Sequence, residues 1–348
     1  MQVYVVIMAG GKGERLWPLS HEARPKQLLC FGSDRSLLRA TFERTVALAS
    51  PEHVFVVTNE QIAENVRMQL PEVPAGNILA EPAGRNTAPC IAYAAASISM
   101  KDKDAVMAIF PSDQLINDED LFIRAVGFGI STLNEHPELL ITLGMIPDQP
   151  ETGYGYIAPG GIIVQDKVFA LHRVNRFHEK PQRNKAVEYL NQGCLWNAGM
   201  FLWRVDAILD EFRSLMPGMY HDLVALRTSL SAGKSAINTF YDKVKPVSID
   251  YGIMEKTRNA ATIPVDFGWN DIGSWDAIGN VLAADNSGNV TDGDVIMEDS
   301  SGSVIFSTHK KIVAIGVEDL VVVEGDKEIL VCPRSRSQEL SAVMKRIK

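Results

Sequence analysis

Short apolar runs alternate with amphipathic stretches along the first 145 residues of the chain. The apolar runs are rich in β-branched residues, which is typical of strands buried on both faces of a sheet. They lie at 3–8, 54–58, 78–80 and 105–110. The stretches between them repeat apolar residues at helical spacing and predict helices over 36–49, 61–70, 88–100 and 121–136. This alternation predicts an α/β fold with a doubly wound, mostly parallel sheet.

The rest of the chain divides into a mixed middle segment and a β-rich end. In the middle, the pattern predicts strands near 154–157 and 169–177, and helices over 184–190, 205–215 and 220–230. The polar run Asp-Asn-Ser-Gly-Asn at 285–289 is the best linker. Beyond it, short β-rich runs recur up to a terminal helix over 338–347. We therefore expect two domains, residues 1–284 and 285–348, the second being a small C-terminal β module.

Composition and charge exclude several classes of partner. The 348 residues carry a formal net charge of −9, which argues against a nucleic-acid or acidic-membrane surface. The four cysteines are scattered without metal-site spacing, so free thiols are expected rather than disulfides or zinc ligands. No apolar stretch approaches the roughly 20 residues of a membrane span, and the N-terminus lacks a basic leader. We expect a cytoplasmic protein with no membrane partner.

A glycine-rich loop follows the first predicted strand. Residues 8–20 read Met-Ala-Gly-Gly-Lys-Gly-Glu-Arg-Leu-Trp-Pro-Leu-Ser, and Arg-Pro-Lys-Gln follows at 24–27. Gly10, Gly11 and Gly13 let backbone amides approach an anion, while Arg15 and Lys26 add positive charge. Since ligands bind at the carboxyl ends of parallel strands, this pattern predicts a polyphosphate cradle there. The alternative is a tight turn with incidental surface charges.

The spacing of this loop excludes two commoner phosphate motifs. A dinucleotide fingerprint aligned on Gly11 and Gly13 needs a third glycine at 16, where Leu16 stands. A Walker A loop needs Gly-Lys followed by Ser or Thr, but Gly13 follows here. Pro18 argues against a helix that starts directly at the turn. The cradle is therefore of another kind.

Two loop aspartates are candidate magnesium ligands. Asp113 ends the run Phe-Pro-Ser-Asp after a buried strand, and Asp271 lies in Trp-Asn-Asp-Ile-Gly-Ser-Trp at 269–275. Mg²⁺ prefers one or two carboxylates together with phosphate oxygens and water. The alternatives are an N-cap for the next helix at Asp113 and a turn former at Asp271.

Two further groups of residues offer polar contacts to a ligand. The first group lies in the run Glu-Pro-Ala-Gly-Arg-Asn-Thr-Ala-Pro at 81–89. Residues 85–87 offer hydrogen-bond donors near the N-terminus of a helix. The alternative is an ordinary loop in which Thr87 is the N-cap of that helix. Glu179, Asn197 and the backbone of Gly155 offer acceptors and donors for a polar ligand, and Lys180 adds a positive charge. The alternatives are a surface charge, a turn residue and a solvated neighbour.

Taken in order, these motifs resemble those of the sugar-nucleotide pyrophosphorylases, and most closely the mannose-1-phosphate guanylyltransferases. The resemblance spans about residues 3–285 and continues more loosely to the end. It implies a nucleotidyltransferase fold of the GT-A-like kind, a β-helix-like C-terminal element and a homodimer. Larger relatives continue into a cupin isomerase domain, so this chain is expected to be a short form.

The resemblance also implies specific site residues. The nucleotide contacts are Ala9, Gly10, Gly11, Gly13, Arg85, Asn86, Thr87 and Ser112. The sugar contacts are Gly155, Glu179, Asn197 and Asp250. The magnesium ligands are Asp113 and Asp271, and the catalytic cations are Arg15, Lys26 and Lys180. Asp250 lies in the run Ser-Ile-Asp-Tyr-Gly-Ile-Met-Glu at 248–255. Gly252 departs from the alanine that is more usual in this motif of the family. The alternative for Asp250 is a cap of the helix that follows.

The implied reaction joins GTP and α-D-mannose 1-phosphate into GDP-mannose and pyrophosphate. The sugar phosphate attacks the α-phosphorus in line, with Mg²⁺ as cofactor and without a covalent intermediate. Two alternatives stay open: the same chemistry on another sugar 1-phosphate or nucleotide, and a catalytically silent regulatory subunit that binds GDP-mannose.

Overall fold

The computed structural model describes residues 1–11, 14–230 and 233–347. The chain forms two compact units. Unit 1 contains Met1–Gly10, Phe42–Pro111 and Ile116–Trp269, and unit 2 contains Gly11–Thr41, Ser112–Leu115 and Asn270–Lys348. Each unit is described by itself.

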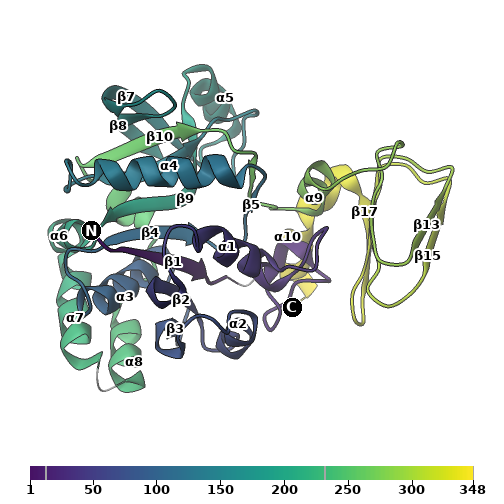
Figure 1. The fold of residues 1–348 in the computed structure, drawn as a ribbon. Coiled ribbons are helices and arrows are strands. Elements are labelled where there is room, and N and C mark those ends of the chain that lie inside the picture. Colours follow the sequence, from purple (N-terminus) through teal and green to yellow (C-terminus); the bar gives the residue numbers. More distant parts are fainter. Residues whose placement is uncertain (12–13, 231–232, 348) are drawn as a thin grey trace. The chain divides into compact units, whose positions relative to one another are not determined.

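Unit 1 is built on a nine-stranded sheet within the described residues, in the order β3-β2-β1-β4-β9-β6-β10-β8-β7 (Figure 1). Its strands are β1 (Val3–Ala9), β2 (Val54–Asn59), β3 (Ile78–Glu81), β4 (Val106–Pro111), β6 (Leu140–Met145), β7 (Gly155–Gln165), β8 (Ala170–His178), β9 (Leu195–Arg204) and β10 (Ala260–Val265).

Strand direction makes this sheet mixed but mostly parallel. Strands β3, β2, β1 and β4 pair in parallel, as do β6 and β10. Strand β9 runs antiparallel to both β4 and β6, and β8 runs antiparallel to both β10 and β7. The other seven strands of the sheet therefore point the same way. The predicted α/β class is confirmed.

Helices cover both faces of the sheet. They are α1 (Leu37–Thr45), α2 (Ala63–Gln69), α3 (Thr87–Ser99), α4 (Glu119–Thr132), α5 (Arg183–Asn191), α6 (Val205–Leu215), α7 (Pro217–Ser229) and α8 (Lys234–Lys243). Among them, α1 begins in unit 2 and ends in unit 1. None of the described helices is both long and apolar enough to cross a bilayer.

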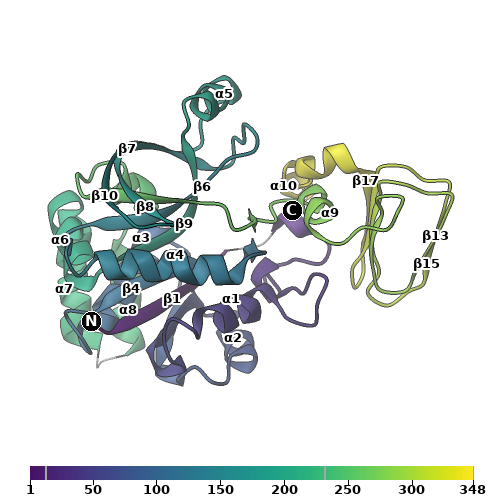
Figure 2. The same ribbon diagram turned by 45° about the horizontal axis from the view of Figure 1, so that its top comes forward.

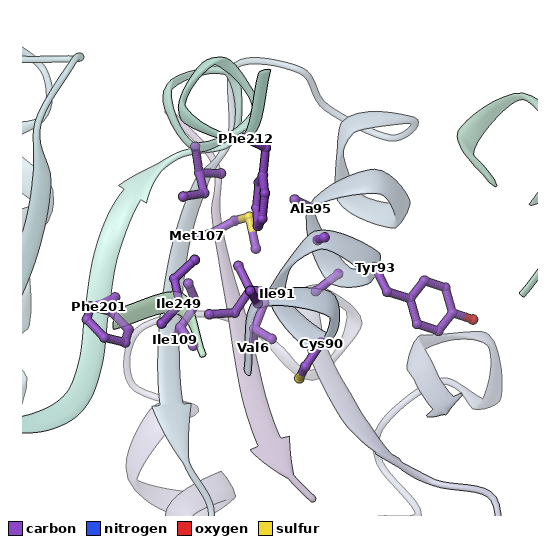
Figure 3. Close-up of a cluster of buried hydrophobic side chains, with 14 of the residues drawn as sticks. Val6, Cys90, Ile91, Tyr93, Ala95, Met107, Ile109, Phe201, Phe212 and Ile249 are labelled. Carbon is purple, nitrogen blue, oxygen red and sulfur yellow. The ribbon is translucent and has the colours of Figure 1, made fainter. Parts of the chain in front are cut away.

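Alternate residues of the strands face opposite layers of helices. On one face, Val6 of β1 and Met107 of β4 pack around Ile91 of α3 (Figure 3). Five alanines of α3 are fully buried, and their small side chains let the helix approach the sheet closely. On the other face, the ring of Phe110 meets that of Phe122 in α4 edge to face, with centroids 5.2 Å apart.

Several elements were not predicted from the pattern. Strands β6, β9 and β10 are buried over much of their length, but Thr, Gly, Asn or Pro interrupts the apolar run in each of them. Helix α8 buries Ala236, Phe240 and Tyr241 along its described length, and most of its other residues are polar, so no apolar run marks it. The predicted helix over 36–49 is shorter, ending at Thr45, although Ser36 accepts a hydrogen bond from the Arg39 amide at 3.0 Å as an N-cap would.

Unit 2 contains the C-terminal β strands. They are β12 (Val290–Asp292), β13 (Val295–Glu298), β14 (Val304–Phe306), β15 (Ile312–Ile315), β16 (Leu320–Glu324) and β17 (Ile329–Pro333). Strands β12, β14 and β16 stack in parallel, as do β13 and β15, so successive turns of the chain lie on one another (Figure 2). This repeated parallel stacking confirms a β-helix-like element.

The core of unit 2 joins segments that are far apart in the sequence. Leu16 and Phe31 pack with Trp275 and Phe306. The Phe31 and Trp275 rings lie 6.4 Å apart edge to face. Helices α9 (Trp275–Val281) and α10 (Leu340–Ile347) belong to the same unit, and β5 (Leu115–Ile116) pairs with β11 (Trp269–Asn270). Residues that follow the glycine loop therefore share a core with the C-terminal strands.

Candidate functional site

The glycine-rich loop begins at the carboxyl end of β1. Ala9 is buried there, and its carbonyl oxygen accepts a hydrogen bond from the Thr58 hydroxyl of β2 at 3.0 Å. Gly11 follows with φ of +114°, a conformation that side chains disfavour. Gly13 lies outside the described residues. Arg15 is exposed in a short 3₁₀ helix, Glu14–Leu16.

Lys26 connects the two predicted metal ligands within unit 2. Its side chain is only 10% exposed. Its Nζ donates to Asp113 Oδ2 at 3.0 Å and also to the carbonyl oxygen of Asp271. The sequence separates Lys26 from these partners by 87 and 245 residues. The fold therefore brings together one cation and two aspartates that were predicted separately.

The alternative for Asp113 is wrong, and a second residue takes part in the turn at Asp271. Helix α4 is capped by Asp118, whose Oδ1 accepts from the Leu121 amide at 2.8 Å, so Asp113 is not its N-cap. The turn at 270–272 is closed by Asn270, whose Oδ1 accepts from the Ile272 amide at 2.8 Å. Asp271 is thus not required as the turn former. Ser112, next to Asp113, is buried.

The two carboxylates of Asp113 and Asp271 fit a magnesium site that is completed by the ligand and water. No group of three or more His, Cys, Asp or Glu residues within the described part of the chain is arranged to hold a metal. Within these described residues, no metal site is therefore formed by three or more of these side chains. Two aspartates, by contrast, match the habit of Mg²⁺ of taking one or two carboxylates and completing its shell with phosphate oxygens and water.

The loop between β3 and α3 is tied to the segment 241–249 of unit 1. Arg85 Nε donates to the Tyr241 carbonyl at 3.1 Å, and the Arg85 carbonyl accepts from the Val247 amide at 3.2 Å. Asn86, at φ of +69°, caps α3 by accepting from the Thr87 amide at 2.8 Å. The alternative in which Thr87 is the N-cap is therefore wrong. The Thr87 hydroxyl instead accepts from the Ile249 amide at 2.9 Å.

Glu81, at the start of this loop, was given no role from the sequence. Its residue surface is 6% exposed, and its Oε1 accepts from the Tyr241 hydroxyl at 2.7 Å. Its Oε2 lies beside Gly10, 3.8 Å from where a Cβ on that glycine would stand. Burial raises the pKa of the Glu81 carboxyl to about 7. A buried carboxylate next to the glycine loop is therefore part of this region. Its partner Tyr241 lies 160 residues away in the sequence, in a helix that was not predicted.

The predicted sugar contacts form one cluster in unit 1. Gly155 of β7 is the register partner of Asn197 in β9. A Cβ on Gly155 would lie 2.6 Å from Glu179 Oε2 and 3.4 Å from Asn197 Cβ, so a side chain there would displace the Glu179 carboxylate. Asn197 Nδ2 donates to Asp250 Oδ1 at 2.9 Å, and Asn197 Oδ1 accepts from the Gly199 amide at 3.1 Å.

This cluster is acidic and partly buried. The Glu179 side chain is 8% exposed and accepts from Lys180 Nζ at 2.6 Å. Burial, and then the nearby charge of Glu179, raise the pKa of Asp250 to about 6. Three alternatives are therefore wrong. Asp250 does not cap a helix, and Asn197 lies in a strand rather than a turn. Glu179 is not a surface charge. Lys180 is 57% exposed, as a solvated neighbour would be.

The predicted residues therefore gather in two units. Unit 1 holds Gly155, Glu179, Lys180, Asn197 and Asp250 in one cluster, and the loop 85–87 beside Glu81. Unit 2 joins Lys26, Asp113 and Asp271 directly. The roles assigned to all of these residues stay predictions.

Comparison with known families and proteins matches the whole chain. A nucleotidyl transferase family model covers residues 4–288, and a model for a MannoseP isomerase/GMP-like beta-helix domain covers residues 293–347. Mannose-1-phosphate guanylyltransferase of Escherichia coli is 37% identical over 350 residues, which are 99% of this chain and 73% of that protein. Xanthan biosynthesis protein XanB of Xanthomonas campestris pv. campestris (strain B100) is 39% identical over 355 residues, with the same coverage.

Solved structures agree with these matches. A protein from Thermus thermophilus, described as a mannose-1-phosphate geranyltransferase, has a TM-score of 0.87 at 32% identity. The alignment covers 100% of this chain and 99% of that one. A Helicobacter pylori structure described as a mannose-6-phosphate isomerase shares the fold, with a TM-score of 0.61 at 23% identity over 77% of this chain and 100% of that one.

Proposed function

We propose, from the premise that this chain belongs to the nucleotidyl transferase family and within it to the mannose-1-phosphate guanylyltransferases, that it transfers GMP from GTP to α-D-mannose 1-phosphate. The products are GDP-mannose and pyrophosphate. The observation that carries the proposal is the contact of Lys26 with Asp113 and Asp271, in a chain of this family whose first strand is followed by a glycine-rich loop.

The reaction is a single displacement at phosphorus. An oxygen of the sugar phosphate forms a bond to the α-phosphorus of GTP while the bond from that phosphorus to the pyrophosphate oxygen breaks. Two polyanions must approach one another, so the residues required are cations and amide donors rather than a nucleophile. Unlike charges about 4 Å apart at an effective dielectric near 20 interact with about 4 kcal/mol.

Different cations of the chain bind different phosphate groups of the substrates. Arg15 and the loop amides at Gly10, Gly11 and Gly13 bind the leaving pyrophosphate, and Lys26 acts on the triphosphate. Lys180 balances the phosphate of the sugar substrate. Nucleotide contacts come from Ala9, the segment 85–87 and Ser112.

The sugar is held by the acidic cluster of unit 1. Glu179 and Asp250 accept hydrogen bonds from hydroxyls, Asn197 both donates and accepts, and the backbone of Gly155 lies against the ring. The 2.9 Å bond from Asn197 to Asp250 fixes both side chains before the sugar arrives, which supports a preformed pocket.

Asp113 and Asp271 would hold Mg²⁺. The ion would neutralise charge on the phosphate oxygens and orient them. We further propose a homodimer, a cytoplasmic location, where GTP is available, and a domain boundary at residues 284/285.

The test is a pyrophosphate-release assay of the full chain over a grid of nucleoside triphosphates and hexose 1-phosphates with Mg²⁺. We expect GTP with mannose 1-phosphate to give the highest kcat/KM. A different best pair would replace the substrates but keep the chemistry. Turnover with no pair, together with binding of GDP-mannose, would favour a silent regulatory subunit and overturn the proposal.

A further inference from the structure

We propose that unit 1 contains a regulatory site for a small organic anion with an apolar body. The site is the cavity that the adjoining ends of α6, α7 and α8 form with the segment 244–256, and its volume is about 400 Å³. A ligand there favours the arrangement of the residues that we assign to the nucleotide and the sugar. The effect on turnover rests on the proposed function, whereas the site itself does not.

Apolar side chains form much of the lining of this cavity. Met216, at the corner between α6 and α7, lines it together with Met219 of α7. Val244 and Val247, from the segment that follows α8, line it as well. Helices α6, α7 and α8 pack beside one another (Figure 1). Methionine side chains adapt to ligands of irregular shape, and the volume lies within the range of about 300–1,000 Å³ that is typical of small-molecule sites.

Three exposed lysines give the cavity a positive charge. They are Lys243, Lys245 and Lys256. Lys243 Nζ lies 3.7 Å from Asp222 Oδ1, the single acidic residue among the described lining residues. Neither of the other two ammonium groups has a carboxylate of the described residues within 4.0 Å. Since the whole chain has a net charge of −9, this local excess of cations beside apolar side chains indicates an anionic ligand.

Gly252 leaves room for the cavity. It is buried within the π-helical turn Asp250–Met254 and belongs to the lining. A Cβ at this position would lie 2.7 Å from Met216 Sδ and 3.7 Å from Val247 Cγ2. Both of these side chains line the cavity too, so the alanine that is more usual in this motif would compete with them for space. The cavity therefore goes with the glycine of this chain.

One wall of the cavity is hydrogen-bonded to the loop that precedes α3. The Val247 amide donates to the Arg85 carbonyl at 3.2 Å, and the Val247 carbonyl accepts from the Ala88 amide at 3.1 Å. Two residues further on, the Ile249 amide donates to the Thr87 hydroxyl at 2.9 Å. A ligand in contact with Val247 therefore acts on the loop that we assign to the nucleotide.

The same wall continues into the sugar cluster. Asp250 begins the π-helical turn and accepts from Asn197 at 2.9 Å. The Gly252 amide, in that turn, donates to the Ser248 carbonyl at 2.9 Å. The cavity and these hydrogen bonds occur together in one conformation, so a ligand that fits the cavity favours the bonded arrangement. The expected effect is activation.

The probe for this site is 8-anilinonaphthalene-1-sulfonate (ANS), which carries one sulfonate on an apolar aromatic body and becomes fluorescent in apolar sites. N-phenyl-1-naphthylamine has the same body without the charge. In fluorescence titrations of the full chain, we expect saturable binding of ANS that is about three- to tenfold tighter than binding of the neutral compound, the range for one or two exposed ion pairs. Equal affinities would overturn the proposal.

Two double variants locate the charge that ANS recognises. Lys245→Gln with Lys256→Gln should weaken ANS binding by about three- to tenfold and leave binding of the neutral compound unchanged. The matched control, Lys103→Gln with Lys167→Gln, removes two exposed lysines that do not line the cavity, and it should bind both probes as wild type does. The same ANS affinity in the two double variants would overturn the proposal.

Gly252→Ala tests the shape of the site. The added methyl group should weaken binding of both probes several-fold, because the flexible end of Met216 must give way. Gly127→Ala in α4, where a Cβ would meet nothing within 4 Å, is the control. Unchanged affinity in Gly252→Ala would overturn the placement of the site. If this variant does not fold, as judged by circular dichroism, the lysine variants decide the placement.

Amide hydrogen exchange followed by mass spectrometry tests the coupling without turnover. Saturating ANS should slow exchange several-fold in peptides that contain the amides of Ala88, Val247 and Ile249, and should leave peptides from α4 unchanged. Unchanged exchange at these three amides would overturn the regulatory role.

Kinetics then test the direction of the effect. In the pyrophosphate-release assay, ANS should lower the KM of wild type for both substrates several-fold. A KM that stays the same or rises would overturn activation. Absence of turnover with every substrate pair would contradict the proposed function, whereas the fluorescence and exchange results concern the site alone.

Discussion

Lys26 is the residue through which unit 2 assembles its polar site. Its buried ammonium pairs with Asp113 and also binds the Asp271 carbonyl, so removing the charge would leave a carboxylate without its partner. The Asp113 side chain is 40% exposed, so water would partly offset the loss of this ion pair, whereas the Lys26 side chain is buried. Lys26 therefore has a structural part to play in addition to any contact with the triphosphate.

Arg15 gives the first prediction at this scale. Arg15→Ala should lower kcat by about 10²–10³-fold, the range for removing one positioned donor to developing charge. The KM for the sugar phosphate should hardly change, because that substrate binds elsewhere. Steady-state kinetics check this. Arg67→Ala removes an exposed arginine paired with Glu64 and serves as the control. Turnover of Arg15→Ala near the wild-type value would remove Arg15 from the catalytic set.

The aspartates give the second prediction. Asp113→Asn and Asp271→Asn should each raise the Mg²⁺ concentration for half-maximal activity by about tenfold or more, because each loses a charged ligand. The asparagine oxygen of Asp113→Asn can still accept from Lys26, so the fold should persist. Titration of activity with MgCl₂ after EDTA treatment measures the effect, and exposed Asp148→Asn is the control. If both variants titrate like wild type, the metal assignment is wrong.

At the scale of elements, the β-helix-like strands depend on tight corners. Gly293, between β12 and β13, has φ of +88°, and a Cβ there would lie 2.0 Å from the carbonyl oxygen of Ser307. Ser307 in turn donates its amide to the Asp292 carbonyl at 2.9 Å. This corner therefore excludes a side chain for two reasons, backbone conformation and close approach.

A pair of glycines separates those two reasons. Gly316 also has positive φ, +64°, but a Cβ there would meet nothing within 4 Å. Gly316→Ala should lower the free energy of unfolding by about 1–2 kcal/mol, the penalty for left-handed backbone. Gly293→Ala should lower it by a further ~1–3 kcal/mol, because Ser307 must move. Urea unfolding of the full chain measures both. Equal losses would show that the close approach is not limiting.

At the scale of the whole molecule, two glutamates link stability to pH in opposite directions. Glu324 accepts from the amides of Thr308, His309 and Lys310, and these bonds lower its pKa from 4.5 to about 2. Its contribution is complete above pH 4.5 and is lost as the pH falls towards 2. Glu81 has a raised pKa, so the folded state holds an extra proton between pH 4.5 and 7, and stability falls as pH rises through that range.

This linkage gives the fourth prediction. Glu324→Gln should be less stable than wild type at pH 7, and the difference should shrink as the pH approaches 2, where wild type also loses the charge. Urea unfolding at several pH values checks this, with the exposed Glu318→Gln as the control. A difference that stays constant with pH would show that the Glu324 charge does not stabilise the fold.

Much of this protein follows from residues that are neighbours in the chain. The alternation of strands and helices, the β-rich end, the glycine loop and its distinction from two other phosphate motifs depend on spacings within a few residues. Such spacings are visible without a fold, because side-chain period and backbone freedom are local properties. The ordered motifs were also sufficient to indicate the family.

The tertiary structure alone decided which distant residues meet. Strand β9 reverses direction between β4 and β6, and no local pattern records direction. Lys26 meets two aspartates, and Glu81 meets Tyr241 across 160 residues. These contacts depend on how strands pair and helices pack, and the free energy that selects them comes from burial summed over the whole core. Sequence therefore determined the local parts and their order, while the fold determined which of them share a site.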